Sequence, residues 1–350
     1  MENINYPKQI YSGKWSTGHV QGIAIDKRRE YMYYSFTTSL VKTDVHGNVI
    51  GSVTGLAGHL GCIAFNYEDG HVYGSLEYKH DQIGQGILDR YTDNAQVEDG
   101  FYIAVFDVEK INRVGMDAES DGVMKAVYLK EVVKDFSAEN HRYGCSGIDG
   151  TTFGPAIDEN NGKNYLYVAY GIYGDVSRTD NDYQVILRYD ISDWEKHCKP
   201  LNQKHMHHSG PISPDDKYFL FTGNTTYGIQ NIEYDSYTKK FLVAVYVGEK
   251  KQYPNYPFFT IDALRKPEEQ LLKGFNDCEE KGKVIFLSDD GILDKSSNIY
   301  GWNFKYGATG MIALGDGYYY FSHNREAKND AETTVKLYKW DGINPFCLVE

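Results

Sequence analysis

The chain has 350 residues, of which 31 are tyrosines, and its 49 acidic and 36 basic side chains give a formal net charge of −13. Hydrophobic residues make up 41% of the chain, which is too large a share for a disordered protein. The acidic balance excludes general nucleic-acid binding, because that activity depends on a basic surface.

The elements predicted along the chain are short β-strands separated by turns. Runs rich in Tyr, Val and Phe occupy residues 31–36, 165–170, 240–246 and 318–322, and such residues fit the half-buried surface of a sheet. Turn residues of the Gly, Asn and Asp type lie between these runs. Residues 267–273 are the best candidate for a short helix, because Pro267 suits a first helical turn.

The predicted strands recur in the same order five times. The first strand of each repeat begins with small or polar residues, the second is aromatic, and the third ends in Asp. The first strands lie at residues 19–25, 59–65, 143–148, 227–232 and 306–311, and the third strands end at Asp44, Asp107, Asp190, Asp262 and Asp341. We expect each of these aspartates to cap the following turn with a side-chain hydrogen bond.

Five repeats of four antiparallel strands resemble the β-propeller architecture, with no specific functional family recognised. The predicted fold is an all-β, single five-bladed β-propeller over residues 1–350, and six blades are the main alternative. A sixth blade would use residues 191–227, which contain a strand of their own at 217–221. The approximate blades are 15–57, 58–138, 139–225, 226–300 and 301–350. Residues 9–15 are expected to join the last blade beside residues 345–349 and to close the ring.

Targeting and redox features are sparse. No basic segment followed by an apolar one marks a signal peptide, and the longest apolar run, about residues 241–247, is far shorter than the ~20 residues of a membrane helix. The five cysteines are widely spaced, which argues against a disulfide framework and a zinc ribbon. We expect a cytoplasmic protein with no membrane or nucleic-acid partner, with export as the alternative.

A binding site is expected at the mouth of the central channel. In a propeller, the loops that lead into the first strands and the loops between second and third strands lie on one face. Ligand-binding residues concentrate on such loops, because the scaffold holds them in place. Two of these loops, residues 79–100 and 174–183, are long, and long loops are often functional.

Three histidines are candidate metal ligands at this mouth. His19 and His59 lie at matching repeat positions, so they should face each other across the channel, and His141 is a third. The cofactor is unknown; a divalent metal ion (Zn, Mn, Fe or Ca) is the candidate. The alternative is that each histidine hydrogen-bonds a loop carbonyl beside its strand.

Several acids near the mouth are candidates for catalysis. Glu77, Asp81, Asp149 and Asp175 could supply the two carboxyls that flank a bond in glycoside cleavage. The chain resembles five-bladed propellers of the arabinanase type in architecture, but their acids lie on inner strands. Here the first strands begin with His, Gln, Tyr and Thr, so no catalytic residue is carried across.

The catalytic hypothesis assigns Glu77 or His80 as the base and His323 as the acid. A nucleophilic pair of Cys145 with His141 is a weaker hypothesis, to which a buried cysteine near the axis is the alternative.

The residues expected to contact a ligand are polar or aromatic. Tyrosine suits sugar rings, because it offers both a flat apolar face and a hydroxyl. Arginine suits an anionic group of the ligand. The expected ligand-binding residues are Gln21, Tyr143, Tyr173, Tyr227, Gln230, Thr309 and Arg325.

The predicted function is therefore capture of a small polar, saccharide-like ligand at the channel mouth, with hydrolase or lyase chemistry if the protein is an enzyme. The alternative is a non-catalytic lectin or a propeller that binds a protein partner. A lectin would repeat its contact residues in every blade, whereas here the residues that begin the first strands differ between blades. This asymmetry favours one unique site.

Overall fold

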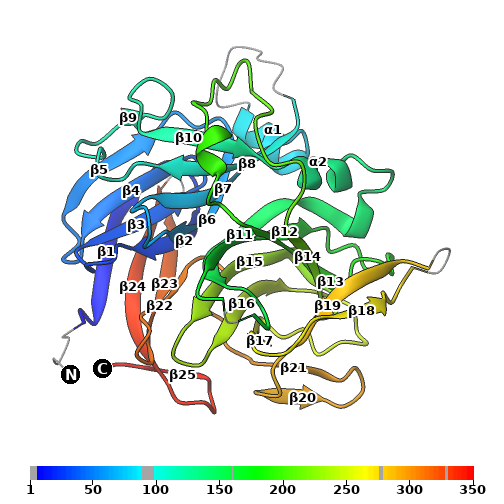
Figure 1. Ribbon diagram of the computed structural model, residues 1–350. Helices are drawn as coiled ribbons and strands as arrows, with labels where there is room; N and C mark the ends of the chain where they lie inside the picture. Colours follow the sequence, from blue (N-terminus) through cyan, green and yellow to red (C-terminus); the bar gives the residue numbers. More distant parts are fainter. Residues whose placement is uncertain (1–5, 89–97, 160, 276–278, 328–329) are drawn as a thin grey trace.

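The computed structural model describes residues 6–88, 98–159, 161–275, 279–327 and 330–350. The fold is all-β, and five small sheets stand in a ring as the blades of a propeller (Figure 1). This confirms the five-bladed architecture predicted from the repeats. That residues 1–350 form one domain, with the blade boundaries given above, stays a prediction.

Each of the first three blades contains four strands in chain order. Blade one comprises β2 (Val20–Ile25), β3 (Tyr31–Phe36), β4 (Ser39–Asp44) and β5 (Val49–Thr54). Blade two comprises β6 (His59–Phe65), β7 (Val72–Tyr78), β8 (Gly100–Phe106) and β10 (Met124–Tyr128). Blade three comprises β11 (Cys145–Pro155), β12 (Asn164–Ile172), β13 (Tyr183–Tyr189) and β14 (Asp216–Phe221).

Blade four is smaller, and blade five joins both ends of the chain. Blade four comprises β15 (Thr225–Asp235), β16 (Lys240–Val247) and β17 (Phe258–Asp262). Blade five comprises β22 (Met311–Ala313), β23 (Tyr318–Ala327), β24 (Asp330–Trp340), β1 (Gln9–Trp15) and β25 (Phe346–Leu348). Strands β1 and β25 both pair with β24, so the N-terminal strand closes the ring.

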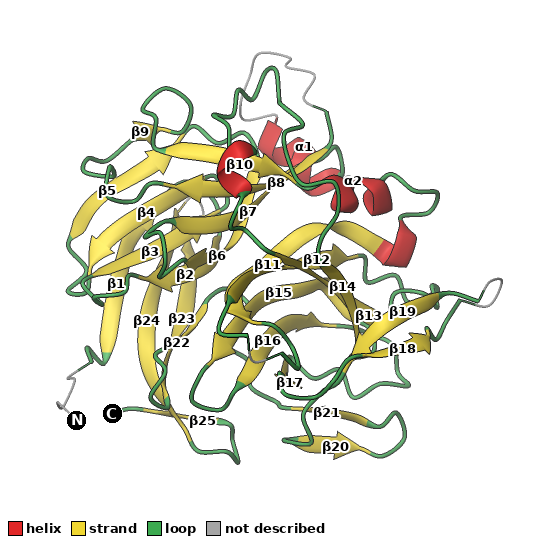
Figure 2. Cartoon of the chain, viewed as in Figure 1, coloured by secondary structure: helices red, strands yellow, loops and turns green. Residues whose placement is uncertain are grey.

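Short elements decorate the ring. Strand β9 (Met116–Asp117) pairs with β5. Strands β18 (Glu268–Leu271) and β19 (Lys281–Ile285) extend blade three. Strand β20 (Ile292–Asp294) pairs with β21 (Ile299–Gly301). The helices are α1 (Gln82–Leu88), α2 (Lys130–Phe136) and the 3₁₀ turns η1 (Arg142–Gly144) and η2 (Trp194–Lys196). Helix α2 packs against β8 and β11 (Figure 2).

Two expectations about these segments were wrong. Residues 217–221 belong to β14, the outermost strand of the four that make up blade three, so they do not begin a sixth blade. The helix expected at residues 267–273 is strand β18, which pairs with β19. A single proline at the start of that segment carried the helix prediction, and pairing with a neighbouring strand overrides so short a signal.

Most of the tyrosines fill the space between blades. Tyrosine accounts for ten of the twelve largest fully buried side chains, including Tyr33, Tyr102, Tyr167 and Tyr319. The aspartates that follow the third strands cap turns as predicted: Asp44, Asp190, Asp262 and Asp341 each accept a hydrogen bond from a backbone N–H two residues on.

None of the helices among the described residues is long and apolar enough to span a membrane. The cytoplasmic location stays a prediction.

Candidate functional site

The first strands of the blades converge on the propeller axis, and a buried ion pair lies where they begin. Lys79 Nζ is 2.6 Å from Glu77 Oε1 and donates a hydrogen bond of 2.9 Å to the carbonyl of Ser146. Glu77 Oε2 accepts a hydrogen bond of 3.1 Å from the backbone N–H of Ile148. Glu77 is 4% and Lys79 is 6% exposed. The pair therefore links blades two and three away from solvent.

Gly147 makes this approach possible. Its φ of +130° lies in a region that favours glycine, and a Cβ at this position would lie 2.0 Å from Glu77 Oε2. The glycine lets the carboxylate of blade two reach the backbone of blade three.

Asp149 lies beside this pair, on the inner strand of blade three. Gln230 Nε2 donates a hydrogen bond of 3.0 Å to Asp149 Oδ2 and another of 3.0 Å to the carbonyl of Tyr227. Burial raises the pKa of Asp149 well above its usual range, and the nearby charge of Glu77 raises it further, while Lys79 and Gln230 act in the opposite direction. Asp149 is half-buried, so its carboxyl keeps contact with solvent while the raised pKa favours its protonated form.

Asp149 was one of the four candidate acids, and it lies inside the first strand of blade three rather than at its start. The residue lies between Ile148 and Thr151, where the register of β11 against β12 shifts. Such an irregularity re-aims a side chain. The glycines on both sides, Gly147 and Gly150, are the sequence signal that could have indicated it.

His59 faces the same cluster. Strand pairing sets it opposite Glu77, with Nδ1 3.7 Å from Glu77 Oε1. Burial and the charge of Lys79 lower the pKa of His59 to about 3, so its ring is neutral near pH 7. Its Nδ1 is buried and makes no hydrogen bond within the described residues.

The axis is closed just beyond this cluster. Asn231 Nδ2 donates to the carbonyls of Gln21 and Ala308, at 3.0 and 2.8 Å. Cys62 Sγ donates to Asn231 Oδ1 at 3.2 Å and lies 3.4 Å from the carbonyl of Thr151. Together these two side chains join all five blades, so the channel mouth is separated from the other end of the axis.

A hollow of about 540 Å³ opens beside the mouth, between blades three and four. Its lining consists of Tyr173, Gly174, Asp175, Arg178, Thr226, Tyr227 and Glu249. Because Gln230 bonds both the backbone of Tyr227 and the carboxyl of Asp149, the hollow and the axial cluster share one wall.

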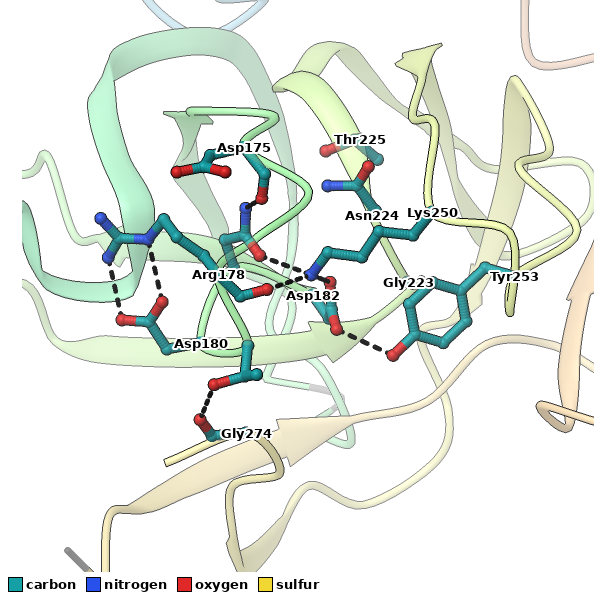
Figure 3. A network of polar contacts seen from close by, with 12 residues as sticks. Asp175, Arg178, Asp180, Asp182, Gly223, Asn224, Thr225, Lys250, Tyr253 and Gly274 are labelled. Atoms are coloured by element: carbon teal, nitrogen blue, oxygen red, sulfur yellow. Dashed lines mark hydrogen bonds and ion pairs between the residues drawn. The ribbon is translucent and has the colours of Figure 1, made fainter. Parts of the chain in front are cut away.

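A buried lysine fixes the loops around this hollow (Figure 3). Lys250 Nζ donates to the carbonyl of Arg178 at 2.6 Å and to Asp182 Oδ1 at 2.5 Å. The other carboxylate oxygen of Asp182 accepts from the hydroxyl of Tyr253 at 2.8 Å. Arg178 in turn donates to both oxygens of Asp180. These hydrogen bonds tie the loop of Arg178 to the loop of Lys250 and so hold the walls of the hollow in place.

The tyrosines near the mouth differ in how they present their rings. Tyr143 and Tyr227 have the same left-handed backbone, with φ of 59° and 62°, and each precedes a glycine. The ring of Tyr143 is 4% exposed, whereas Tyr227 is 40% exposed and lines the hollow. Tyr246 is 39% exposed, and burial together with the charges of Asp149 and Glu326 raises its pKa to about 12. Tyr227 and Tyr246 are therefore available to a ligand.

The catalytic residues predicted from the sequence do not converge. Glu77 is enclosed by Lys79 and the backbone of Ile148. His80 is exposed and hydrogen-bonds Asp99 at 3.0 Å through Nδ1. His323 stacks on Tyr306 at 3.9 Å and its Nε2 is 2.9 Å from the hydroxyl of Tyr338, within blade five. The assignment of Glu77 or His80 as base and His323 as acid is thus not supported by the geometry.

The three predicted metal ligands are also separated by their partners. His19 is exposed and bonds Glu326 at 2.6 Å, while His141 Nδ1 bonds the carbonyl of Phe136 at 2.6 Å. Within the described ranges, no three His, Cys, Asp or Glu side chains form a group that could hold a metal ion. The nucleophile hypothesis for Cys145 is disfavoured too, because burial raises the pKa of its thiol.

The predicted ligand-binding residues divide into two groups. Tyr173, Tyr227 and Gln230 border the hollow or its shared wall with the axis. Tyr143 instead packs inside blade three and donates to Glu280 at 2.7 Å, and Thr309 bonds Ser322 at 2.9 Å.

The two remaining predicted contacts lie on blades one and five. Gln21 Nε2 is 3.4 Å from Thr37 Oγ1. Arg325 lies opposite Glu332 in the register of β23 and β24, and the Glu332 carboxylate accepts a hydrogen bond from Tyr11 of β1. Three residues at the candidate site were not among the predicted ligand-binding residues: Lys79, Asp149 and Tyr246.

Comparison with known proteins gives only distant matches. No protein-family model matches the chain, and no curated protein matches it. The soluble aldose sugar dehydrogenase of Escherichia coli matches with a TM-score of 0.41 and 8% identity, over 94% of this chain and 98% of that one. The pyranose dehydrogenase PQQ domain of Coprinopsis cinerea matches with a TM-score of 0.35 and 10% identity, over 90% and 81%.

The Bombyx mori GH32 β-fructofuranosidase BmSUC1 matches with a TM-score of 0.42 and 11% identity, over 99% of this chain and 66% of that one. Similarities of this size carry no inference about activity, so the function of this chain is argued from its own residues.

Proposed function

We propose that the protein binds a small saccharide-like ligand at the channel mouth and that Asp149 donates a proton to it in a hydrolysis or elimination. The observation that carries the proposal is the Asp149 carboxyl. It keeps contact with solvent, and its pKa is raised by burial and further by the Glu77 charge beside it. A carboxyl group with a raised pKa is suited to general acid catalysis, because the acid must hold a proton before it donates one to the glycosidic oxygen.

In this proposal Glu77 is a positioning residue. Its oxygens are held by Lys79 and Ile148, so it acts on Asp149 through charge and does not touch the ligand. Gln230 orients the Asp149 carboxyl through its hydrogen bond to Oδ2.

Exposed tyrosines near the hollow favour a saccharide as the ligand. Tyr227 and Tyr246 expose about two fifths of their surface, and Tyr173 lines the same hollow. Tyr246 does not line the hollow itself but pairs across strands with Thr226, which does. Rings of this kind stack on the apolar faces of sugars while their hydroxyls bond to polar groups. Aspartate and glutamate at the hollow, Asp175 and Glu249, add acceptors for ligand hydroxyls.

The binding part is tested by calorimetry with a panel of neutral mono- and oligosaccharides. We expect Tyr227→Ala to weaken binding about tenfold, because the variant lacks one aromatic ring that stacks on the sugar. Tyr237→Ala is the matched control, because Tyr237 is also on blade four and is 57% exposed but does not line the hollow. If no saccharide binds, or if both variants lose binding equally, the proposal fails.

The catalytic part is tested with Asp149→Asn against aryl glycosides and uronides of the sugars that bind. Asparagine keeps the hydrogen bond to Gln230 but has no proton to donate, so we expect turnover to fall by 10²-fold or more, in line with the typical contribution of a general acid, with ligand affinity retained. Asp193→Asn, an exposed carboxylate 62% accessible, is the control. Unchanged turnover in Asp149→Asn would leave binding as the function of the site.

A further inference from the structure

A second cavity lies at the opposite end of the axis. It has a volume of about 430 Å³ and is formed where the first strands of all five blades end. Asn231 and Cys62 separate this cavity from the channel mouth, so it is independent of the site proposed above. The cavity is large enough for a small organic molecule.

The inner part of this cavity carries one carboxyl group, that of Glu233 on β15. Glu233 Oε1 accepts a hydrogen bond of 3.1 Å from the backbone N–H of Ala313, and Oε2 accepts one of 3.1 Å from Thr152 Oγ1. The side chain is half-buried and lines the cavity. The nearby charge of Asp235 contributes to raising its pKa, and within the described ranges Glu233 forms no ion pair with a basic side chain. The carboxyl is thus oriented by the protein but has no counter-ion.

The walls above Glu233 are mainly apolar and aromatic. They are supplied by Ile23, Ile63, Phe65, Phe153, Tyr234 and Ile312. Such walls favour the hydrocarbon part of a ligand, and aromatic faces also favour an ammonium group.

The rim of the cavity is basic. Lys27 and Arg29 lie on the turn between β2 and β3 and line the cavity with Asp26. The Arg29 guanidinium already donates to the hydroxyl of Tyr6 and, at 2.6 Å, to the carbonyl of Leu314. The Asp26 carboxylate accepts hydrogen bonds from the backbone N–H groups of Arg28, Glu30 and Tyr31, so it is occupied within its own turn. Among the described residues, Lys27 Nζ donates a long hydrogen bond of 3.5 Å to the carbonyl of Tyr67. Its ammonium is available to an anionic group.

We propose that this cavity binds a small zwitterion, a molecule with an ammonium group and a carboxylate joined by a short apolar chain. The ammonium pairs with Glu233 on the cavity wall, the chain packs against the apolar side chains, and the carboxylate meets Lys27 at the rim. A simple cation would leave Lys27 unmatched, and a simple anion would make no ion pair with Glu233.

Proton release provides a second signature. Burial raises the pKa of Glu233 to about 8, so near pH 7 the carboxyl is mostly protonated. An ammonium group beside it favours the ionised form, and binding should release close to one proton per ligand. The titratable and charged groups around it are Asp26, Lys27, Arg29, Tyr67 and Asp235.

The experiment is calorimetry at pH 7 with three probes of matched length: 6-aminohexanoate, hexylammonium and hexanoate. We expect 6-aminohexanoate to bind about tenfold more tightly than either of the others, because only it satisfies both ends. Repeating the titration in two buffers of different ionisation enthalpy measures the released proton. Equal or tighter binding of hexylammonium or hexanoate, or no binding of any probe, overturns the proposal.

Two variants and a control localise the binding. Glu233→Gln should remove the advantage of 6-aminohexanoate over hexanoate and abolish the proton release. Lys27→Gln should weaken 6-aminohexanoate severalfold and leave hexylammonium unchanged. Arg28→Gln removes a positive charge from the same turn but from a residue that does not line the cavity, so it should bind as the unmodified protein does. If Glu233→Gln fails to fold, the probe order and the Lys27 variant still decide the question. Unchanged binding in Lys27→Gln overturns the rim assignment.

Discussion

At the residue scale, the candidate site depends on a few side chains whose charges are buried. The Glu77–Lys79 pair is almost fully enclosed, and each member also bonds backbone of blade three. A buried pair of this kind contributes little net stability by itself, but removing one partner leaves an uncompensated charge. The pair therefore constrains which substitutions blade three tolerates.

The first prediction follows from that constraint. Glu77→Gln should lower the free energy of unfolding by about 3 kcal/mol, because the Lys79 ammonium keeps its burial and loses its closest counter-ion. Urea unfolding measures the change. The exposed pair of Lys196 and Asp193 is the control, and Asp193→Asn should change stability by no more than about 1 kcal/mol. Equal effects at the two pairs would contradict the prediction.

The second prediction concerns pH and Glu233. Because the folded-state pKa of this acid is raised from 4.5 to about 8, the folded protein holds a proton that the unfolded chain releases. Between these values, stability falls as pH rises, by at most about 1.4 kcal/mol per pH unit for this group. Glu233→Gln should flatten the unfolding free energy between pH 5 and 8. Glu30→Gln, an exposed acid of the same face, should leave the slope as it is.

At the element scale, irregular strands create the site. Strand β11 shifts register against β12 at two places, between Cys145 and Gly147 and between Ile148 and Thr151. The first shift brings Gly147 next to Glu77, and the second contains Asp149. In a regular strand, successive side chains point to opposite faces of the sheet. Such a strand could not direct both the backbone N–H of Ile148 and the carboxyl of Asp149 to the cluster around Glu77.

The third prediction tests Gly147. Gly147→Ala should cost more than about 2 kcal/mol, because the new Cβ meets Glu77 Oε2 at 2.0 Å and the φ of +130° is strained for alanine. Gly122→Ala is the control: its φ is +65°, but nothing lies within 4 Å of its Cβ position. It should cost about 1 kcal/mol from backbone conformation alone. Chemical denaturation of both variants separates the contact from the strain, and equal losses would exclude the contact with Glu77.

These elements also show what the sequence could and could not reveal. Strand order and turn caps were predictable, because apolar runs and aspartates such as Asp44 and Asp262 repeat along the chain and act locally. The partners of Glu77, His80 and His323 were not, because they are set by contacts between strands or across loops. Matching repeat positions placed His19 and His59 near one another, but burial and individual hydrogen bonds decide what each ring does.

At the scale of the whole molecule, the ring is held together at its edge and at its axis. Strand β1 pairs with β24 and joins the two ends of the chain within blade five. At the axis, Asn231 bonds the carbonyl of Gln21 in blade one and of Ala308 before blade five, and accepts from Cys62 of blade two. The same contacts close the channel. The hydrogen bonds of Asn231 therefore both stabilise the ring and separate the channel mouth from the cavity at the opposite end of the axis.

The fourth prediction therefore concerns Asn231. Asn231→Ala leaves the carbonyls of Gln21 and Ala308 without this donor and the buried Cys62 thiol without its acceptor, and we expect a loss of about 3 kcal/mol. Because the lost bonds belong to different blades, hydrogen exchange should rise in the first strands of blades one, two and five as well as in blade four. Asn48→Ala, an exposed asparagine in a turn of blade one, should cost no more than about 1 kcal/mol and raise exchange only locally. Loss of protection confined to blade four would show that the axial contacts do not couple the blades. Loss of protection in several blades would show that one side chain at the axis stabilises the closed propeller as a unit. The repeated blade pattern alone cannot provide this coupling, because its hydrogen bonds lie within single blades.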